Sequence, residues 1–155
     1  MKLNSILIFL ALIIVSKSCN GQEKNEKNFK PKKDKTELLN LKDNPSFEKQ
    51  ISLLKKSMIE YMETADPSYS KNDVEECEKI LNNYLSDMSN SKSKDEGMKI
   101  VKNTVEKLNQ LNEKCNFELI ETSEREQIVD VIILASSKKG YNRLEDDITE
   151  NWRKW

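Results

Sequence analysis

Few groups of residues in this chain have the types and spacing of a catalytic or metal-binding site. Asp146, Asp147 and Glu150 place three carboxylates within five positions, a donor set suited to a hard cation such as Ca²⁺. Their spacing is not that of an EF-hand loop, and helix capping explains them more simply. Residues 136–138 read Ser-Ser-Lys, but no glycine elbow accompanies them. Because the chain has no histidine, it lacks the commonest general base and metal ligand, so we expect no enzyme, metal or cofactor.

One cysteine has a distinctive setting at the start of the chain. Lys2 gives a positively charged beginning, residues 6–15 are an unbroken apolar run, and the small residue Ser18 precedes Cys19. This order is typical of a secretory signal peptide. Ten apolar residues are too few to span a bilayer, which needs about 20.

With Cys19 in place, this segment resembles a bacterial lipoprotein signal. The resemblance implies that residues 1–18 are removed and that Cys19 carries acyl chains such as palmitate, which anchor it at ~0.8 kcal/mol per buried methylene. Ser16 and Lys17 depart from the usual motif, and a cleaved, freely secreted protein is the alternative. Asn20 is not the aspartate that retains some lipoproteins in the inner membrane, so the resemblance favours the outer membrane of the cell envelope.

Residues 19–35 are expected to form a disordered tether. Beyond the cysteine they contain one aromatic residue, Phe29, and no aliphatic residue, so they lack the apolar surface that a core needs. Four lysines in residues 30–35 are suited to anionic lipid heads, with a solvated spacer as the simpler alternative. The formal charge of the whole chain is −1 and falls to about −3 without the leader, which indicates no nucleic-acid partner.

Four amphipathic segments follow the tether. Only three glycines and three prolines interrupt the chain, and its many lysines and glutamates favour helix. Apolar residues recur at steps of three and four in each segment. We therefore expect an all-α fold, a four-helix bundle-like domain over residues 36–155, with helices at 45–64, 73–88, 95–114 and 124–139.

Local signals refine these helices. An Asn-Pro pair at 44–45 begins the first helix, and residues 73–76 and 123–126 offer capping boxes for the second and fourth. Gly140 ends the fourth helix, which is apolar around most of its circumference, so we expect it to be the most buried. Residues 147–155 predict a last helical turn.

The connection between the third and fourth helices breaks the helical pattern. Residues 115–120 contain Phe117, Leu119 and Ile120, which we expect in an extended connection packed on the bundle. A short strand is the alternative.

Cys77 and Cys115 are the two thiols left once Cys19 is lipidated. An oxidising envelope would permit a bridge between them. In an antiparallel hairpin turning near residue 92 they are about eight residues out of register, which is ~12 Å along a helix, whereas bridged Cα atoms lie within about 7 Å. We predict two free, mostly buried thiols, unless the chain folds back at Cys115.

Aromatic and arginine residues near the C-terminus are the best candidates for contact with another molecule, because such residues concentrate at binding hot spots. They are Tyr141, Trp152, Arg153 and Trp155. The alternative is intramolecular, with both indoles packed on the bundle to fasten a terminus that would otherwise fray.

The last third of the chain resembles a family of small bacterial envelope proteins of unknown function. The residues that carry the resemblance are Thr-Ser-Glu-Arg-Glu-Gln-Ile at 122–128, Gly140, and Asp-Ile-Thr-Glu-Asn-Trp-Arg-Lys-Trp at 147–155. The resemblance implies a compact helical domain and supplies no catalytic residue or ligand.

We therefore expect a non-enzymatic, lipid-anchored envelope protein that binds a protein partner, as an inhibitor, an immunity-like factor or an assembly accessory. The alternative is a carrier or sensor of a small apolar ligand held between the helices. A pocket above about 300 Å³ would favour the carrier, and an exposed apolar patch of several hundred Å² would favour the protein binder.

The anchor can be tested directly. Replacing Cys19 with serine removes the acylated sulfur, so Cys19→Ser is expected to move the protein from the membrane to the soluble fraction or to block its processing. Fractionation followed by mass spectrometry of the mature N-terminus checks this. A variant that fractionates and matures like the wild type would disprove the anchor.

Overall fold

The computed structural model describes residues 40–155, which contain four α-helices and no strand. They are α1 (Pro45–Ala65), α2 (Lys71–Asn90), α3 (Lys94–Lys114) and α4 (Thr122–Lys138). The predicted all-α, four-helix fold is confirmed. The signal peptide, Cys19 and the tether lie outside the described residues. None of the described helices is both long enough and apolar enough to cross a bilayer.

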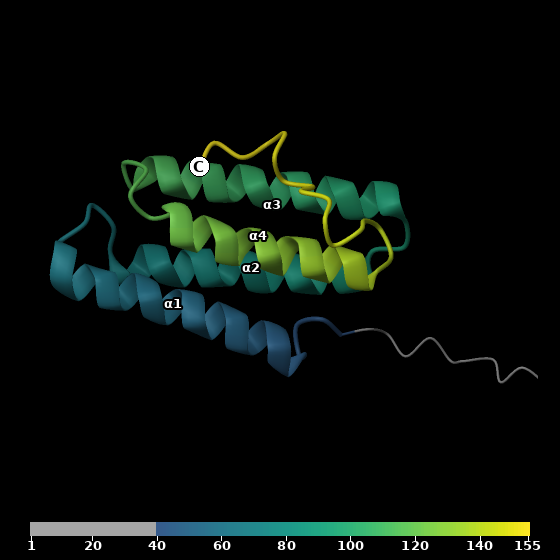
Figure 1. The fold of residues 1–155 in the computed structure, drawn as a ribbon, viewed down its shortest axis with the longest axis horizontal. Helices are drawn as coiled ribbons and strands as arrows, with labels where there is room; N and C mark the ends of the chain where they lie inside the picture. The colour runs from purple at the N-terminus through teal and green to yellow at the C-terminus, as the bar shows by residue number, and fades with distance from the viewer. Residues whose placement is uncertain (1–39) are drawn as a thin grey trace, which may run out of the picture. The chain divides into compact units, whose positions relative to one another are not determined.

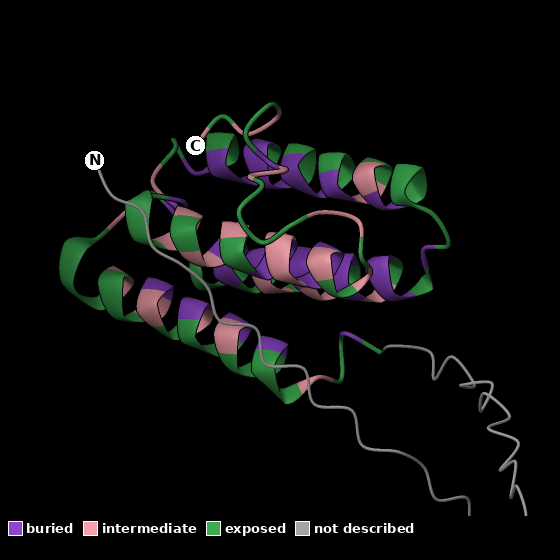
Figure 2. Cartoon of the chain, turned by 45° about the vertical axis from the view of Figure 1, so that its right-hand side comes forward, coloured by how far each residue is buried: buried purple, intermediate pink, exposed green. Residues whose placement is uncertain are grey.

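α2 is the central helix. It contacts α1, α3 and α4, whereas α4 contacts α1 and α2. Figure 1 shows α1, α2 and α3 running side by side, with α4 over α2 and the C-terminal chain crossing from α4 over α3. In Figure 2 the buried residues of α1 and of α3 form a stripe that faces the middle of the bundle, and the opposite side of each is exposed.

The central position of α2 overturns the prediction that the fourth helix is the most buried. Nine residues of α2 are buried, but only five of α4 are, and Val129 and Ile133 remain half-exposed. An apolar circumference is not sufficient for burial when a helix packs on one side only. Tyr84 of α2, 1% exposed, donates to the Ile132 carbonyl at 2.7 Å and so joins α2 to α4 in the core.

The helix caps differ in part from those predicted. Asn44 caps α1 through its side chain, as expected. The N-cap of α2 is Ser70, three residues earlier than predicted. Its capping box pairs Ser70 with Asp73 and not Asp73 with Glu76. Hydrogen bonds from Lys114 and Ser70 lower the pKa of Asp73 to about 2, so this cap is charged at neutral pH. The box expected at residues 123–126 is absent, since Ser123 bonds Glu124 instead.

The α3–α4 connection is a tight turn, not an extended segment or strand. The amide of Asn116 donates to Glu113 at 3.1 Å, and the amide of Phe117 donates to the Asn112 carbonyl at 2.7 Å, the pattern of a Schellman motif. Leu119 and Ile120 are buried as predicted. Phe117 is not packed on the bundle: it is 55% exposed.

Cys77 and Cys115 are both free and buried, as predicted. The Lys114 ammonium lies 2.7 Å from Asp73, which places the end of α3 beside the first turn of α2. Burial raises the pKa of Cys77 to about 12 and that of Cys115 to about 11. Both thiols are therefore protonated at neutral pH and are poor nucleophiles.

Alkylation of the mature protein tests this arrangement. In the native protein both thiols are expected to resist iodoacetamide at pH 8, and after denaturation without reductant both are expected to react. Mass spectrometry counts the labels, with the same chain reduced before labelling as the control. If neither thiol reacts after denaturation, a bridge exists and the assignment of free thiols is wrong.

Candidate functional site

The chain after α4 turns back over the bundle as a segment without regular structure, residues 139–155, called here the strap. Gly140 adopts φ +75°, a conformation that glycine takes without steric cost. Its amide donates to Ser137, and the next amide, of Tyr141, donates to Ser136. This second Schellman motif reverses the chain, and Figure 1 shows the strap continuing across to α3.

Tyr141 is half-buried and is held by hydrogen bonds beside the start of α3. Its hydroxyl lies 3.2 Å from both the hydroxyl and the carbonyl oxygen of Ser91. A Cβ atom added at Gly97 would lie 2.4 Å from the Tyr141 ring, so only glycine admits the ring at this point. Gly97 is therefore present in the first turn of α3 to make room for the strap.

Asn109 of α3 holds the end of the strap. Its side-chain Nδ2 donates to the carbonyl of Trp152 at 2.8 Å, and its Oδ1 accepts from the amide of Lys154 at 3.0 Å. Asn109 is only 8% exposed. One side-chain amide thus satisfies two main-chain groups, as a neighbouring strand would.

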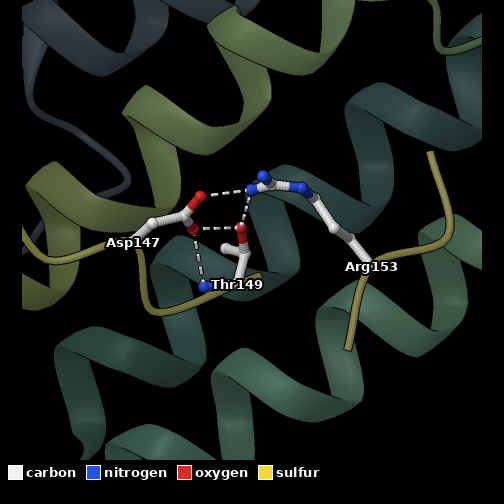
Figure 3. A network of polar contacts seen from close by, with 3 residues as sticks. All are labelled: Asp147, Thr149 and Arg153. Atoms are coloured by element: carbon white, nitrogen blue, oxygen red, sulfur yellow. Dashed lines mark hydrogen bonds and ion pairs between the residues drawn. The ribbon is translucent and has the colours of Figure 1, made fainter. Parts of the chain in front are cut away.

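Arg153 is bound within the strap itself (Figure 3). Its guanidinium pairs with Asp147 and donates to the hydroxyl of Thr149 at 3.0 Å, while the Thr149 hydroxyl donates to Asp147 at 2.7 Å. Thr149 is completely buried. Burial raises the pKa of Asp147, but the hydrogen bonds from Thr149 and Arg153 outweigh it, so the pKa lies below its ordinary value.

These contacts account for two of the three carboxylates near the C-terminus, Asp146 and Asp147, but not for Glu150. Asp146 accepts from the amide of Arg143 at 3.0 Å, and Asp147 serves the network with Thr149 and Arg153. The expected last helical turn is a single turn, closed by hydrogen bonds to the Thr149 carbonyl, and does not continue as a helix.

The four candidate interaction residues do not form one surface. Tyr141 lies at Ser91, Trp152 lies at Asn109, and Arg153 is tied to Asp147. Trp155 is half-buried against the core, and its indole nitrogen has no hydrogen-bond partner. Each residue is in intramolecular contact, yet each keeps part of its surface exposed.

A polar cleft of about 370 Å³ lies between the outer face of α3 and the end of the strap. Five of its lining residues come from α3, of which Asn109 is buried and the other four are exposed, and three come from the strap. The four exposed residues of α3 are Lys102, Glu106, Gln110 and Glu113, and those of the strap are Asn151, Trp152 and Lys154. This cleft is called the strap cleft below.

A second surface, the distal surface, is formed where the α1–α2 and α3–α4 loops meet. The Ser68 amide donates to Glu118 at 2.6 Å and ties the two loops together. A hollow of about 140 Å³ opens between them. Its lining residues are Tyr61, Tyr69, Glu118, Glu121, Ser123 and Glu124. We define the distal surface as these residues and the exposed Phe117.

Phe117 is the unusual residue of the distal surface. Phe117 adopts a φ of +65°, and Asn116 before it adopts a φ of +53°. Asparagine tolerates this left-handed conformation, but for a bulky aromatic residue it is a genuine outlier. The sequence pattern did not reveal it, because an apolar residue between helices reads as a packing residue.

The charge of the distal surface is uniform in sign. Residues 59–70 and 115–124, which form this end of the bundle, contain six carboxylates and no lysine or arginine. Tyr61 is 44% exposed beside them. Glu60 is paired with Lys56 of its own helix at 3.5 Å, and the aromatic rings among the remaining carboxylates suit a positively charged group.

Comparisons with known proteins add nothing to this geometry: no family model matches the chain, and neither the curated proteins nor the solved structures contain a match. The resemblance of the last third to an envelope family stays a prediction.

Asn109→Ala tests how the strap is held. The loss of the amide leaves two main-chain groups without partners, so we expect the free energy of unfolding to fall by about 1–3 kcal/mol. Hydrogen exchange at the Lys154 amide should quicken while exchange at Tyr141 stays slow. Asn103→Ala is the matched control, because Asn103 is an exposed residue of the same helix and its loss should leave the protection of Lys154 unchanged. Unchanged exchange at Lys154 in Asn109→Ala would contradict the clamp.

Proposed function

We propose that this protein is a non-enzymatic, lipid-anchored protein of the bacterial cell envelope that binds a protein partner through its distal surface. The partner presents basic side chains. The exposed Phe117, held at positive φ, is the observation that carries the proposal.

The left-handed conformation of Phe117 costs free energy that burial of its side chain does not offset. The left-handed region costs an L-residue roughly 1–2 kcal/mol, and glycine would avoid that cost. A buried phenylalanine would offset it through burial, but Phe117 is 55% exposed. Backbone strain of this kind clusters at functional sites, and exposed aromatic rings are frequent binding anchors.

The place of the distal surface suits an anchored protein. The described chain begins at Asn40, at the end of the bundle where α1 starts, and Figure 1 shows both loops of the distal surface at the opposite end. The 21 residues of α1 separate these ends by about 31 Å. The segment that would carry the lipid enters the domain where α1 starts, so the attachment point and the loop of Phe117 lie at opposite ends of the domain (Figure 1).

The chemistry of the partner follows from charge. Glu118, Glu121 and Glu124 surround the hollow beside Tyr61, without a lysine or arginine among the residues that line it. A basic side chain entering the hollow would meet carboxylates and the aromatic ring together. The partner is accordingly a protein with lysine or arginine residues beside an apolar contact for Phe117.

The carrier alternative has weaker support. Between α1 and α2 the apolar lining, which includes Ile51, Leu54 and Met58, leaves no room for a water molecule. A groove of about 360 Å³ between α2 and α3 is large enough to hold the ligand of a carrier. Of its lining residues, however, only Ile80 and Leu111 are apolar. An apolar ligand would be poorly covered there.

A site-specific photo-crosslinker in place of Phe117 tests the proposal in the full-length, membrane-anchored protein. We expect a defined adduct with one envelope protein whose cross-linked segment is basic. The triple variant Glu118→Gln, Glu121→Gln and Glu124→Gln should lose that adduct, because it removes the attracting charge.

The matched control places the same crosslinker at Leu144, which is 60% exposed on the strap. It should not give the adduct. The same adduct from both positions, an adduct that survives the triple variant, or an adduct only to the lysines of the tether would each contradict the proposed partner.

A further inference from the structure

The strap cleft has the composition of a site for an uncharged, hydroxyl-rich molecule. It shares no residue with the distal surface. We propose that the strap cleft binds a neutral sugar of one or two rings, packed on the indole of Trp152 and held by side chains of α3.

The charges that line the strap cleft cancel. Lys102 and Lys154 contribute two positive charges, and Glu106 and Glu113 contribute two negative charges. Lys102 already approaches Glu106 to 3.8 Å. The cleft therefore attracts neither an anion nor a cation strongly, in contrast to the acidic distal surface.

The remaining polar groups of the cleft suit hydroxyls. Gln110 and Asn151 each carry a side-chain amide that both donates and accepts hydrogen bonds. A sugar hydroxyl also both donates and accepts, so a ring of them can pair with amides, carboxylates and ammonium groups at once. Gln110 is exposed on the outer face of α3 and has no structural partner among the described side-chain hydrogen bonds.

Trp152 supplies the apolar wall. The C–H groups on the face of a sugar ring carry partial positive charge, and the face of an indole is negative, so the two surfaces attract. The backbone of Trp152 is fixed by the hydrogen bond from Asn109 to its carbonyl, at 2.8 Å, and by the bond from its own amide to Thr149, at 3.0 Å. A fixed main chain at Trp152 leaves only its side chain to be ordered when a ligand binds, which lowers the entropic cost of binding.

The size of the strap cleft sets the size of the ligand. Its volume of about 370 Å³ lies near the lower end of the range of ~300–1,000 Å³ for ligand pockets. It is open and polar, which suits a hydrated ligand better than an apolar one. One or two sugar rings fit this space.

Titration of the full-length protein in detergent micelles with two neutral disaccharides, chitobiose and maltose, tests the proposal. Tryptophan fluorescence and calorimetry are the readouts. We expect at least one disaccharide to bind at millimolar concentration or below. Gln110→Ala should weaken that binding by about two- to tenfold through the loss of one or two hydrogen bonds, without changing the melting temperature.

Trp152→Ala should weaken the binding by tenfold or more, and Trp155→Phe is its matched control because Trp155 does not line the cleft. Retained affinity in both Gln110→Ala and Trp152→Ala would overturn the site. Absence of binding by either disaccharide would overturn it as well. Tighter binding of trialanine with both ends blocked, an uncharged peptide of similar size, would assign the cleft to peptides instead.

Discussion

The structure depends on how the inner side of α3 is covered. α4 packs on α1 and α2, and α2 is the main helical neighbour of α3, so the strap covers much of the rest of α3. A segment without regular structure brings main-chain groups that need partners when they are buried. Asn109 and Thr149 provide those partners, and Gly97 opens the space for Tyr141. The irregular C-terminus is thus part of the core rather than an appendage.

Hydrophobic periodicity predicted the helices well because each helix carries one continuous buried stripe. It predicted neither their neighbours nor the relative burial of α2 and α4, because a stripe records that a face is covered and not what covers it. The roles of Asn109 and Asn112 were not visible either. Both are polar residues at buried positions, and only the tertiary structure shows that each one bonds main-chain groups of an irregular segment. Trp152 and Arg153 were predicted as candidate interaction residues from their residue types alone. Phe117 could be recognised as a candidate only from its backbone conformation in the structure.

The distal surface is acidic, whereas the sequence before the described residues contains four lysines between positions 30 and 35. A basic partner of the kind proposed would be attracted by the distal surface and repelled by those lysines. The two charged regions therefore favour opposite kinds of partner.

The space between α1 and α2 is filled, so the open hollows of the described residues lie at the surface, on the loops and along α3. Two such places carry a partly exposed aromatic ring, and α3 controls both. The Asn112 carbonyl accepts the amide of Phe117, and its side chain accepts the amide of Ile120. Asn109, one turn earlier on the same buried face, holds Trp152 and Lys154. Two asparagines three residues apart thus fix the backbone of both rings, so α3 is the element that positions both surfaces.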